Sequence, residues 1–156
     1  MNAQDGTLKS AGFIGKSENK VDAKGRLSIP PAFKKILVPD AEDELVIQYV
    51  PSGHLLLFNC EQYSKMQKDI MDRGHIIGKE KMWKTIHRLS EHSHLSSVDS
   101  QRRITIPAWL LKMAGISKQV LTFGAFDRVS LWAPEKYDEW ISDSDIDDTI
   151  SDLGLF

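Results

Sequence analysis

Apolar and polar residues alternate along two short stretches of the chain, and the two stretches have nearly the same sequence. The first reads VDAKGRLSIP at positions 21–30, and the second reads VDSQRRITIP at positions 98–107. Alternation with a period of two is typical of a strand with one buried face, and Asp followed by small or polar residues is typical of a tight turn. Each stretch is therefore predicted to form a β-hairpin.

The pattern after each hairpin also repeats. Proline precedes the helical stretches PAFKKIL and AWLLKMAGI, and proline suits the first turn of a helix, where the N–H group has no partner. Two apolar strands follow in each copy, LVIQYV with HLLLF and VLTFGA with VSLW. A further helix is expected to begin at CEQYSKMQKDIM in the first copy and at PEKYDEWI in the second.

The similarity between the two copies is not limited to these elements. An offset of 77 positions relates Asp22, Arg26, Ile29, Pro30 and Lys35 to Asp99, Arg103, Ile106, Pro107 and Lys112. An offset of 74 positions relates Val46, Leu57, Glu61 and Tyr63 to Val120, Leu131, Glu135 and Tyr137. The change of offset places extra residues of the first copy in the polar stretch VPDAEDE, and surface loops tolerate such insertions. One small module is therefore predicted to occur twice in the chain.

Neither module is large enough to fold alone. Each has roughly 45 residues, which lies below the size at which a single core usually suffices. Two modules packed together would bury enough apolar surface, so we expect an intrachain pseudo-dimer. The predicted organisation is repeat 1 at 15–62, a helical connector at 63–90, repeat 2 at 91–134, and a C-terminal helix with an acidic tail at 135–156.

The connector shows helical periodicity in two segments. Met66 and Ile70 lie on one predicted stripe, and Met82, Ile86 and Leu89 lie on a second one, with the break RGHIIGK between them. A pair of helices is therefore expected to join the modules. Apolar residues exposed on these helices would serve either subunit contacts or intrachain packing, and the sequence leaves both open.

Composition limits the class of protein. Of the 156 residues, 41% are hydrophobic, which is enough for a packed core and too many for a disordered chain. The sequence lacks a run of about eighteen apolar residues, so no transmembrane helix is expected, and the N-terminus lacks a signal-peptide pattern. The single cysteine, Cys60, excludes an intrachain disulfide and is expected to be buried or partly buried. A cytoplasmic protein is the simplest expectation.

The net charge of −2 is unevenly distributed. Residues 1–36 contain seven Lys and Arg against three Asp and Glu, a charge of +4, whereas residues 134–156 contain one Lys against eight acidic residues, a charge of −7. A basic segment and an acidic tail are compatible with a nucleic-acid binder that keeps the two surfaces apart. The sequence leaves open whether the tail is only solvated, is disordered, or competes for the basic surface.

The repeated pattern D-x-x-x-R-[LI]-x-[IL]-P resembles the SpoVT–AbrB family of swapped-hairpin DNA-binding modules. Two such modules joined by helices are similar to the MraZ family of bacterial transcriptional regulators, and the segments GFIGKSENKVDAKGRLSIP and VLTFGAFDRVSLWAPEKYDEW extend the likeness over 13–140. The resemblance implies an α+β fold, mainly β, in which two repeats form a duplicated swapped-hairpin barrel with connecting helices.

The resemblance also implies partners and a cellular role. It implies a ring-shaped homo-oligomer that binds double-stranded DNA at short direct repeats near its own promoter. The expected role is repression or autoregulation of the division and cell-wall gene cluster, in the cytoplasm and associated with the nucleoid.

The resemblance places the DNA-binding surface on the first hairpin and the basic residues around it. With the second copy of the motif included, the candidate DNA-binding residues are Lys16, Lys20, Lys24, Arg26, Arg102 and Arg103. Asp22 and Asp99 would orient the arginine that follows each by four positions. A carboxylate at the first turn position can accept backbone N–H groups and pair with that arginine, and a fixed guanidinium suits bidentate contact with guanine or phosphate. A structural ion pair that only closes the hairpin stays open for both turns.

The two copies differ at one position of the turn, where the first has Gly25 and the second has Arg102. Glycine accepts a positive φ without steric cost, whereas arginine would cost about 1 kcal/mol or adopt another turn. The second hairpin therefore need not present Arg103 as the first presents Arg26. We expect the first copy to contact DNA and the second to be mainly architectural.

Two other classes of function deserve comparison. The stretch HRLSEHSH places His87 and Glu91 four residues apart on a helical face, a spacing that metal ligands use, but it lacks both H-E-x-x-H and a cysteine ligand. Cys60 has no evident partner base, so we expect no enzymatic activity, metal, cofactor or small-molecule substrate. The remaining alternative is an interaction module without DNA binding, such as an antitoxin-like scaffold, against which the duplication and the helical connector argue.

Overall fold

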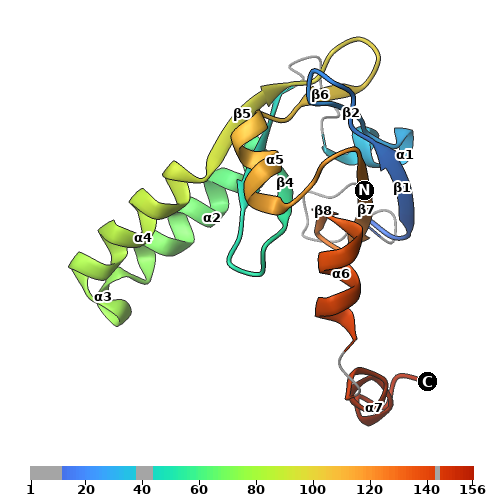
Figure 1. Cartoon of the computed structure of the whole chain (residues 1–156). Coiled ribbons are helices and arrows are strands. Elements are labelled where there is room, and N and C mark those ends of the chain that lie inside the picture. The colour runs from blue at the N-terminus through green and yellow to red at the C-terminus, as the bar shows by residue number, and fades with distance from the viewer. Residues whose placement is uncertain (1–11, 38–43, 143–144) are drawn as a thin grey trace, which may run out of the picture.

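The structure is a computed structural model, and it describes residues 12–37, 44–142 and 145–156 (Figure 1). Its elements follow one another in an order that repeats after the connector. In chain order they are β1 (Lys16–Lys20), β2 (Arg26–Ser28), α1 (Pro31–Leu37), β3 (Glu44–Tyr49), β4 (Leu55–Asn59), α2 (Cys60–Asp72), α3 (Gly74–Ile77), α4 (Lys79–Glu91), β5 (Ser93–Ser97), β6 (Arg103–Thr105), α5 (Ala108–Ala114), β7 (Gln119–Ala125), β8 (Arg128–Trp132), α6 (Pro134–Ile141) and α7 (Ile146–Asp152).

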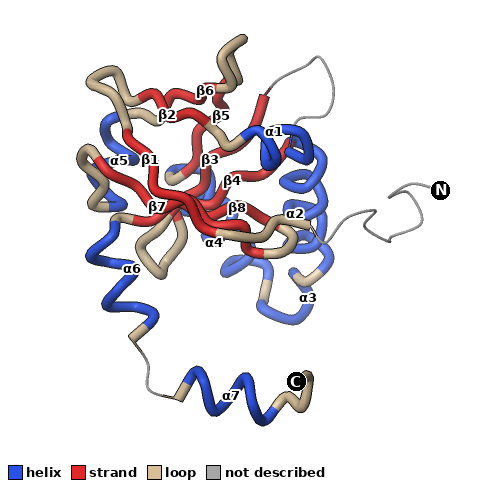
Figure 2. The backbone as a smooth tube through the Cα atoms, turned by 90° about the vertical axis from the view of Figure 1, so that its right-hand side faces the viewer, coloured by secondary structure: helices blue, strands red, loops and turns tan. Residues whose placement is uncertain are grey.

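Six strands form one antiparallel sheet in the order β1-β7-β8-β4-β3-β5, and β2 and β6 form a separate two-stranded ribbon (Figure 2). The first strand of each copy is exchanged, because β1 pairs with β7 and β5 pairs with β3. This exchange is the swapped-hairpin arrangement, and the predicted α+β class is confirmed. The predicted barrel is not closed among the described strands, since β1 and β5 are the two opposite edges of the sheet.

An approximate twofold axis relates the two copies. In the ribbon Leu27 lies opposite Ile104, and in the large sheet Leu56 of β4 lies opposite Ser130 of β8. In both pairs the second residue is the counterpart of the first, at offsets of 77 and 74 positions. The chain therefore folds as the pseudo-dimer that its repeat predicts. The exact limits proposed for the repeats and the connector stay predictions.

The sheet register corrects the sequence alignment of the copies at one strand. Leu45 of β3 lies opposite Ser96, and Val120 of β7 lies opposite Asn19, the counterpart of Ser96. Leu45 and not Val46 is therefore the counterpart of Val120, and both of these residues are buried in the core. A shift of one residue would turn the wrong side of the strand inward, so burial decides the register.

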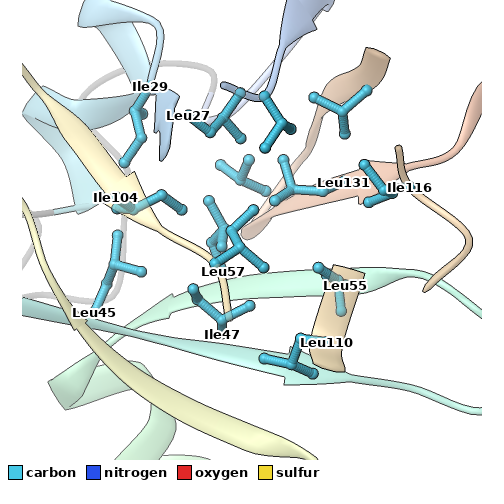
Figure 3. Packing of buried hydrophobic residues seen from close by; sticks show 14 of the residues in the cluster. Leu27, Ile29, Leu45, Ile47, Leu55, Leu57, Ile104, Leu110, Ile116 and Leu131 are labelled. Carbon is cyan, nitrogen blue, oxygen red and sulfur yellow. The ribbon is translucent and has the colours of Figure 1, made fainter. Parts of the chain in front are cut away.

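The core is a single apolar cluster to which both copies contribute (Figure 3). The ribbon supplies Leu27 and Ile104, and the strands of the large sheet supply Leu57 and Leu131. The short helices α1 and α5 cover the cluster, with Leu110 of α5 fully buried. Burial of each such side chain stabilises the fold by about 1.5–3 kcal/mol, and the cluster draws these residues from both copies.

The helical connector projects from the body as an antiparallel pair, α2 and α4, with the short α3 at its tip (Figure 1). A capping box starts α2: the Asn59 side chain accepts from the Gln62 N–H at 2.7 Å, and the Gln62 side chain accepts from the Asn59 N–H at 3.2 Å. At the tip, Gly74 packs closely against the side chain of Met82, which would have to shift to admit a Cβ at this position. The predicted pair of connecting helices is present.

The C-terminal region adds two helices. Pro134 is the first residue of α6, in the position that the sequence predicts. In both views α7 lies apart from the body of the molecule, beyond the free end of α6 (Figures 1 and 2). The acidic tail thus contains a helix. Across the residues that the structure describes, every helix is too short or too polar to span a bilayer.

Candidate nucleic-acid interface

The first candidate turn is held together by the carboxylate of Asp22. Its Oδ1 atom accepts hydrogen bonds from the backbone N–H groups of Lys24 at 2.9 Å and Arg26 at 2.8 Å. Its Oδ2 atom accepts from the Nε–H of Arg26 at 2.7 Å. The backbone bond from Arg26, followed by its side-chain bond, holds the pKa of Asp22 below its usual value. The carboxylate therefore closes the turn and fixes the Arg26 guanidinium at the same time.

The second turn has the same contacts. Asp99 accepts from the N–H groups of Gln101 at 2.8 Å and Arg103 at 2.9 Å, and from the Nε–H of Arg103 at 2.8 Å. The backbone bond from Arg103, reinforced by the side-chain bond, lowers the pKa of Asp99. Arg102 has a φ of 59°, so it adopts the left-handed conformation that Gly25 adopts in the first turn. Of the two alternatives that the sequence left open, the backbone strain at Arg102 is therefore the one observed, and the second hairpin presents Arg103 as the first presents Arg26.

The ribbon joins the two turns on one surface. The N–H of Ile29 donates to the carbonyl of Arg102, and the N–H of Ile106 donates to the carbonyl of Gly25, both at 2.8 Å. Each hairpin therefore holds the turn of the other. Alternation along β2 and β6 buries one face of the ribbon and leaves the other face partly or fully open to solvent, with Arg26, Ser28, Arg103 and Thr105 on it.

The guanidinium groups of Arg26 and Arg103 are available for hydrogen bonds to a further partner. The Arg26 and Arg103 side chains are 33% and 27% exposed, so neither is sealed in the core. The Asp bonds use only the Nε atom of each, and the terminal guanidinium nitrogens have no partner among the described residues. Two fixed planar forks thus face solvent on the ribbon.

The lysines gather around the first turn. Lys20 and Lys24 line a hollow of about 490 Å³ beside the Asp22 turn, together with Lys118. Lys16 lies at the other end of β1, on the same exposed face as Lys20. Lys118 is not among the residues predicted from the sequence, and it reaches this site because the N–H of Val21 donates to its carbonyl at 2.8 Å. Its position just before a predicted strand was a weak signal, since the partner of that strand could not be known.

The second turn lacks an equivalent cluster of lysines. The counterparts of Lys16, Lys20 and Lys24 at the offset of 77 positions are Ser93, Ser97 and Gln101. Arg102 is the one cation that the second motif gains relative to the first. The geometry of the two turns is thus shared, whereas the lysines that surround the first turn are absent at the matching positions of the second. The basic surface is centred on the first copy.

Alternative chemical sites find little support. The Nδ1 atom of His87 lies 2.9 Å from the carbonyl oxygen of Trp83, and His92 packs edge-on against Tyr49. Within the described residues, no group of three or more His, Cys, Asp or Glu side chains could hold a metal ion. Cys60 is exposed, and the expectation of a buried or partly buried thiol is wrong because this residue occupies the first turn of α2, outside the core.

The exchanged strands and the paired Asp–Arg turns define a protein of the duplicated swapped-hairpin class, with an AbrB-like fold. A family model described as "MraZ protein, putative antitoxin-like" matches residues 89–151. The transcriptional regulator MraZ of Chlorobium phaeobacteroides (strain BS1) is 34% identical, over 86% of this chain and 91% of its own length. The MraZ regulator of Christiangramia forsetii is also 34% identical, over 86% of each chain. The chain belongs to the MraZ family, whose members are transcriptional regulators and not enzymes.

Proposed function

We propose that the protein is a sequence-specific DNA-binding regulator that acts as a repressor or autoregulator. The observation that carries the proposal is the Asp22 turn, where a carboxylate fixes one side of the Arg26 guanidinium and leaves the terminal nitrogens available. Such a fork matches the two acceptor atoms of guanine in the major groove, and that groove admits a two-stranded ribbon such as β2–β6.

The lysines would supply affinity and register. Lys20, Lys24 and Lys118 surround the hollow beside the same turn, and ammonium groups in that position can contact phosphates on either side of a base that Arg26 reads. Binding through phosphate contacts releases counterions, so the affinity should fall steeply as the salt concentration rises. The second turn, without these lysines, would contribute mainly to the fold and, through Arg102 and Arg103, to secondary contacts.

We further propose that several copies assemble into a ring-shaped homo-oligomer, which binds short direct repeats near the promoter of its own gene in the division and cell-wall cluster. One chain offers a single lysine-rich turn, so tight binding requires several turns that engage successive repeats together. Membership of the MraZ family supports this assignment. The expected location is the nucleoid within the cytoplasm.

The test is a mobility-shift assay with DNA from upstream of the protein's own gene. Arg26→Ala is expected to weaken binding about 5- to 150-fold, which corresponds to the roughly 1–3 kcal/mol of one bidentate base contact. Arg103→Ala is the matched control, because it removes the same pair from the second turn, and it should weaken binding less. Circular dichroism and light scattering would verify that both variants fold and assemble.

Two outcomes would contradict the proposal. A folded and assembled Arg26→Ala protein with undiminished affinity would remove Arg26 from the interface. A wild-type protein without DNA affinity, even at low salt, would favour the interaction module without DNA binding.

A further inference from the structure

The C-terminal helix α7 presents an apolar stripe that nothing in the described structure covers. Ile146, Ile150 and Leu153 follow at intervals of four and three residues, so they lie on one side of the helix, and they are 38%, 43% and 64% exposed. The acidic residues Asp147 and Asp148 lie away from this stripe. A helix of seven residues is not stable in water by itself, so α7 is expected to need a surface that covers the stripe.

A matching surface exists at the other end of the fold. An apolar groove of about 320 Å³ runs between α2 and α4, and its floor and walls include Met66, Ile70, Met71, Trp83, Ile86 and Leu89. Met71 and Trp83 are 49% and 43% exposed, so the groove is open to a partner. A groove between two antiparallel helices is suited to the apolar side of a third helix.

The charges of the two surfaces are complementary. Residues 142–156 contain five Asp and neither Lys nor Arg. In contrast, α4 carries Lys79, Lys81, Lys84 and Arg88 against two glutamates. Lys79 lies one turn before Trp83, on the groove side of α4, and within the part of the chain that the structure describes it forms no ion pair, so it can face an acidic helix. Apolar contact and charge thus favour the same pairing.

We propose that α7 of one copy docks into the α2–α4 groove of a second copy of this chain. The four residues between α6 and α7 can span at most about 14 Å, and α7 lies beyond the free end of α6 while the connector projects elsewhere (Figures 1 and 2). A neighbouring copy is therefore a better partner than the same chain. Because the contact is head-to-tail, it propagates from copy to copy and can close a ring. It rests on the self-association in the proposed function and not on DNA binding.

Site-directed cross-linking tests the contact directly. Two differently tagged chains, both with Cys60→Ser, are co-expressed, one with Ile150→Cys and the other with Met71→Cys, and treated with a short bis-maleimide. The expected product is a covalent pair of the two tagged chains. The matched control replaces Met71→Cys by Ile76→Cys, which is 72% exposed at the connector tip and outside the groove. A yield no higher than this control overturns the proposal.

A chain that carries both Ile150→Cys and Met71→Cys distinguishes the two possible arrangements. If its cysteines cross-link within one chain and the differently tagged chains do not cross-link to each other, the groove is filled by its own α7, and the proposal of a second copy fails. A cross-link from Ile150→Cys to Lys20→Cys, without one to Met71→Cys, would place the tail on the basic surface and would also overturn it.

Light scattering on the full chain then measures what the contact contributes to assembly. Ile150→Asp is expected to reduce the assembled mass at least twofold, whereas Ser151→Asp, which adds the same charge outside the stripe, should leave it unchanged. Equal masses for the two variants at every concentration would overturn the proposal. If the wild-type protein assembles and cross-links as expected but binds no DNA, the proposed function fails while this contact stands.

Discussion

At the scale of residues, the left-handed position in each turn decides which side chain the turn accepts. Gly25 has a φ of 81° and Arg102 a φ of 59°. The left-handed region open to L-residues lies at about +50° to +70°, so Arg102 falls inside this region and Gly25 falls beyond it. A Cβ at Gly25 would also collide with the carbonyl oxygen of Ile106. The first turn therefore requires glycine, whereas the second tolerates arginine at a cost of about 1 kcal/mol.

The difference between Gly25 and Arg102 predicts how substitutions at the two positions affect stability. Gly25→Ala is expected to lower the free energy of unfolding by more than about 1 kcal/mol, because the new Cβ meets both a strained backbone and a close carbonyl. Arg102→Gly is the matched change at the second turn, and it should alter the stability by less than about 1 kcal/mol, since strain relief offsets the greater entropy of an unfolded glycine. Urea denaturation measures both, and equal losses would contradict the argument.

The turn contacts themselves were predictable from the sequence. An Asp that accepts the N–H groups of its own turn and pairs with an Arg four residues later involves only local backbone geometry, and the bonds of Asp22 and Asp99 have that form. Lys118 was not predictable as a neighbour of Lys24. It joins the site only because β7 pairs with β1, and that pairing links residues far apart in the chain.

At the scale of elements, the two copies attach equivalent helices to the sheet in different ways. Tyr63 on α2 donates a hydrogen bond to the buried side chain of Gln48 at 2.7 Å. Its counterpart on α6, Tyr137, stacks on Phe123 at 4.3 Å between ring centroids. Gln48 also donates to the backbone carbonyl of Leu89, which ties the end of α4 to the sheet. The hydrogen bonds of Gln48 thus attach the connector to the sheet, whereas the stacking of Tyr137 on Phe123 attaches the C-terminal helix α6.

Beside Tyr137, Trp132 of β8 extends the aromatic cluster to a histidine with a shifted pKa. His54 stacks on Trp132 with ring centroids 4.0 Å apart and an interplanar angle of 13°. Its Nδ1 atom is buried and has no hydrogen-bond partner among the described residues. Burial lowers the pKa of His54 from 6.5 to about 4, because the charged ring would lose its hydration.

Stability is therefore expected to depend on pH through His54. Between pH 6.5 and about 4 the unfolded chain binds a proton that the folded protein excludes, so stability falls as the pH decreases through this range. Urea denaturation at pH 7, 6 and 5 measures the slope. His54→Phe keeps an aromatic ring on Trp132 without titrating, and it should flatten the slope. The same slope in this variant would show that other groups cause the pH dependence.

At the scale of the whole molecule, strand exchange makes one cooperative unit of two small modules. Each edge strand pairs only with the other copy, and the ribbon consists of one strand from each. Removal of either copy would therefore expose the buried half of the other. The swapped topology, and not the size of either module, allows modules of roughly 45 residues to share a sufficient core.

A substitution in the core tests whether the two copies unfold as one cooperative unit. Leu57→Ala, at a fully buried position of β4, is expected to lower the free energy of unfolding by about 2–5 kcal/mol and to shift the whole unfolding transition. Circular dichroism and tryptophan fluorescence should report a single, coincident transition. Ile76→Ala, at an exposed position of α3, should change the stability by no more than about 0.5 kcal/mol. Separate transitions for the two copies would contradict a shared core.

The sequence by itself determined the repeat, the order of its elements and the contacts within each Asp–Arg turn, because these depend on local periodicity and local backbone geometry. It did not determine that β1 pairs with β7, that the described strands leave the barrel open, or that Leu45 and not Val46 corresponds to Val120. Pairing partners and register depend on contacts between distant segments, and only burial in the shared core selects among them. The tertiary structure therefore decided which basic residues gather around the first turn.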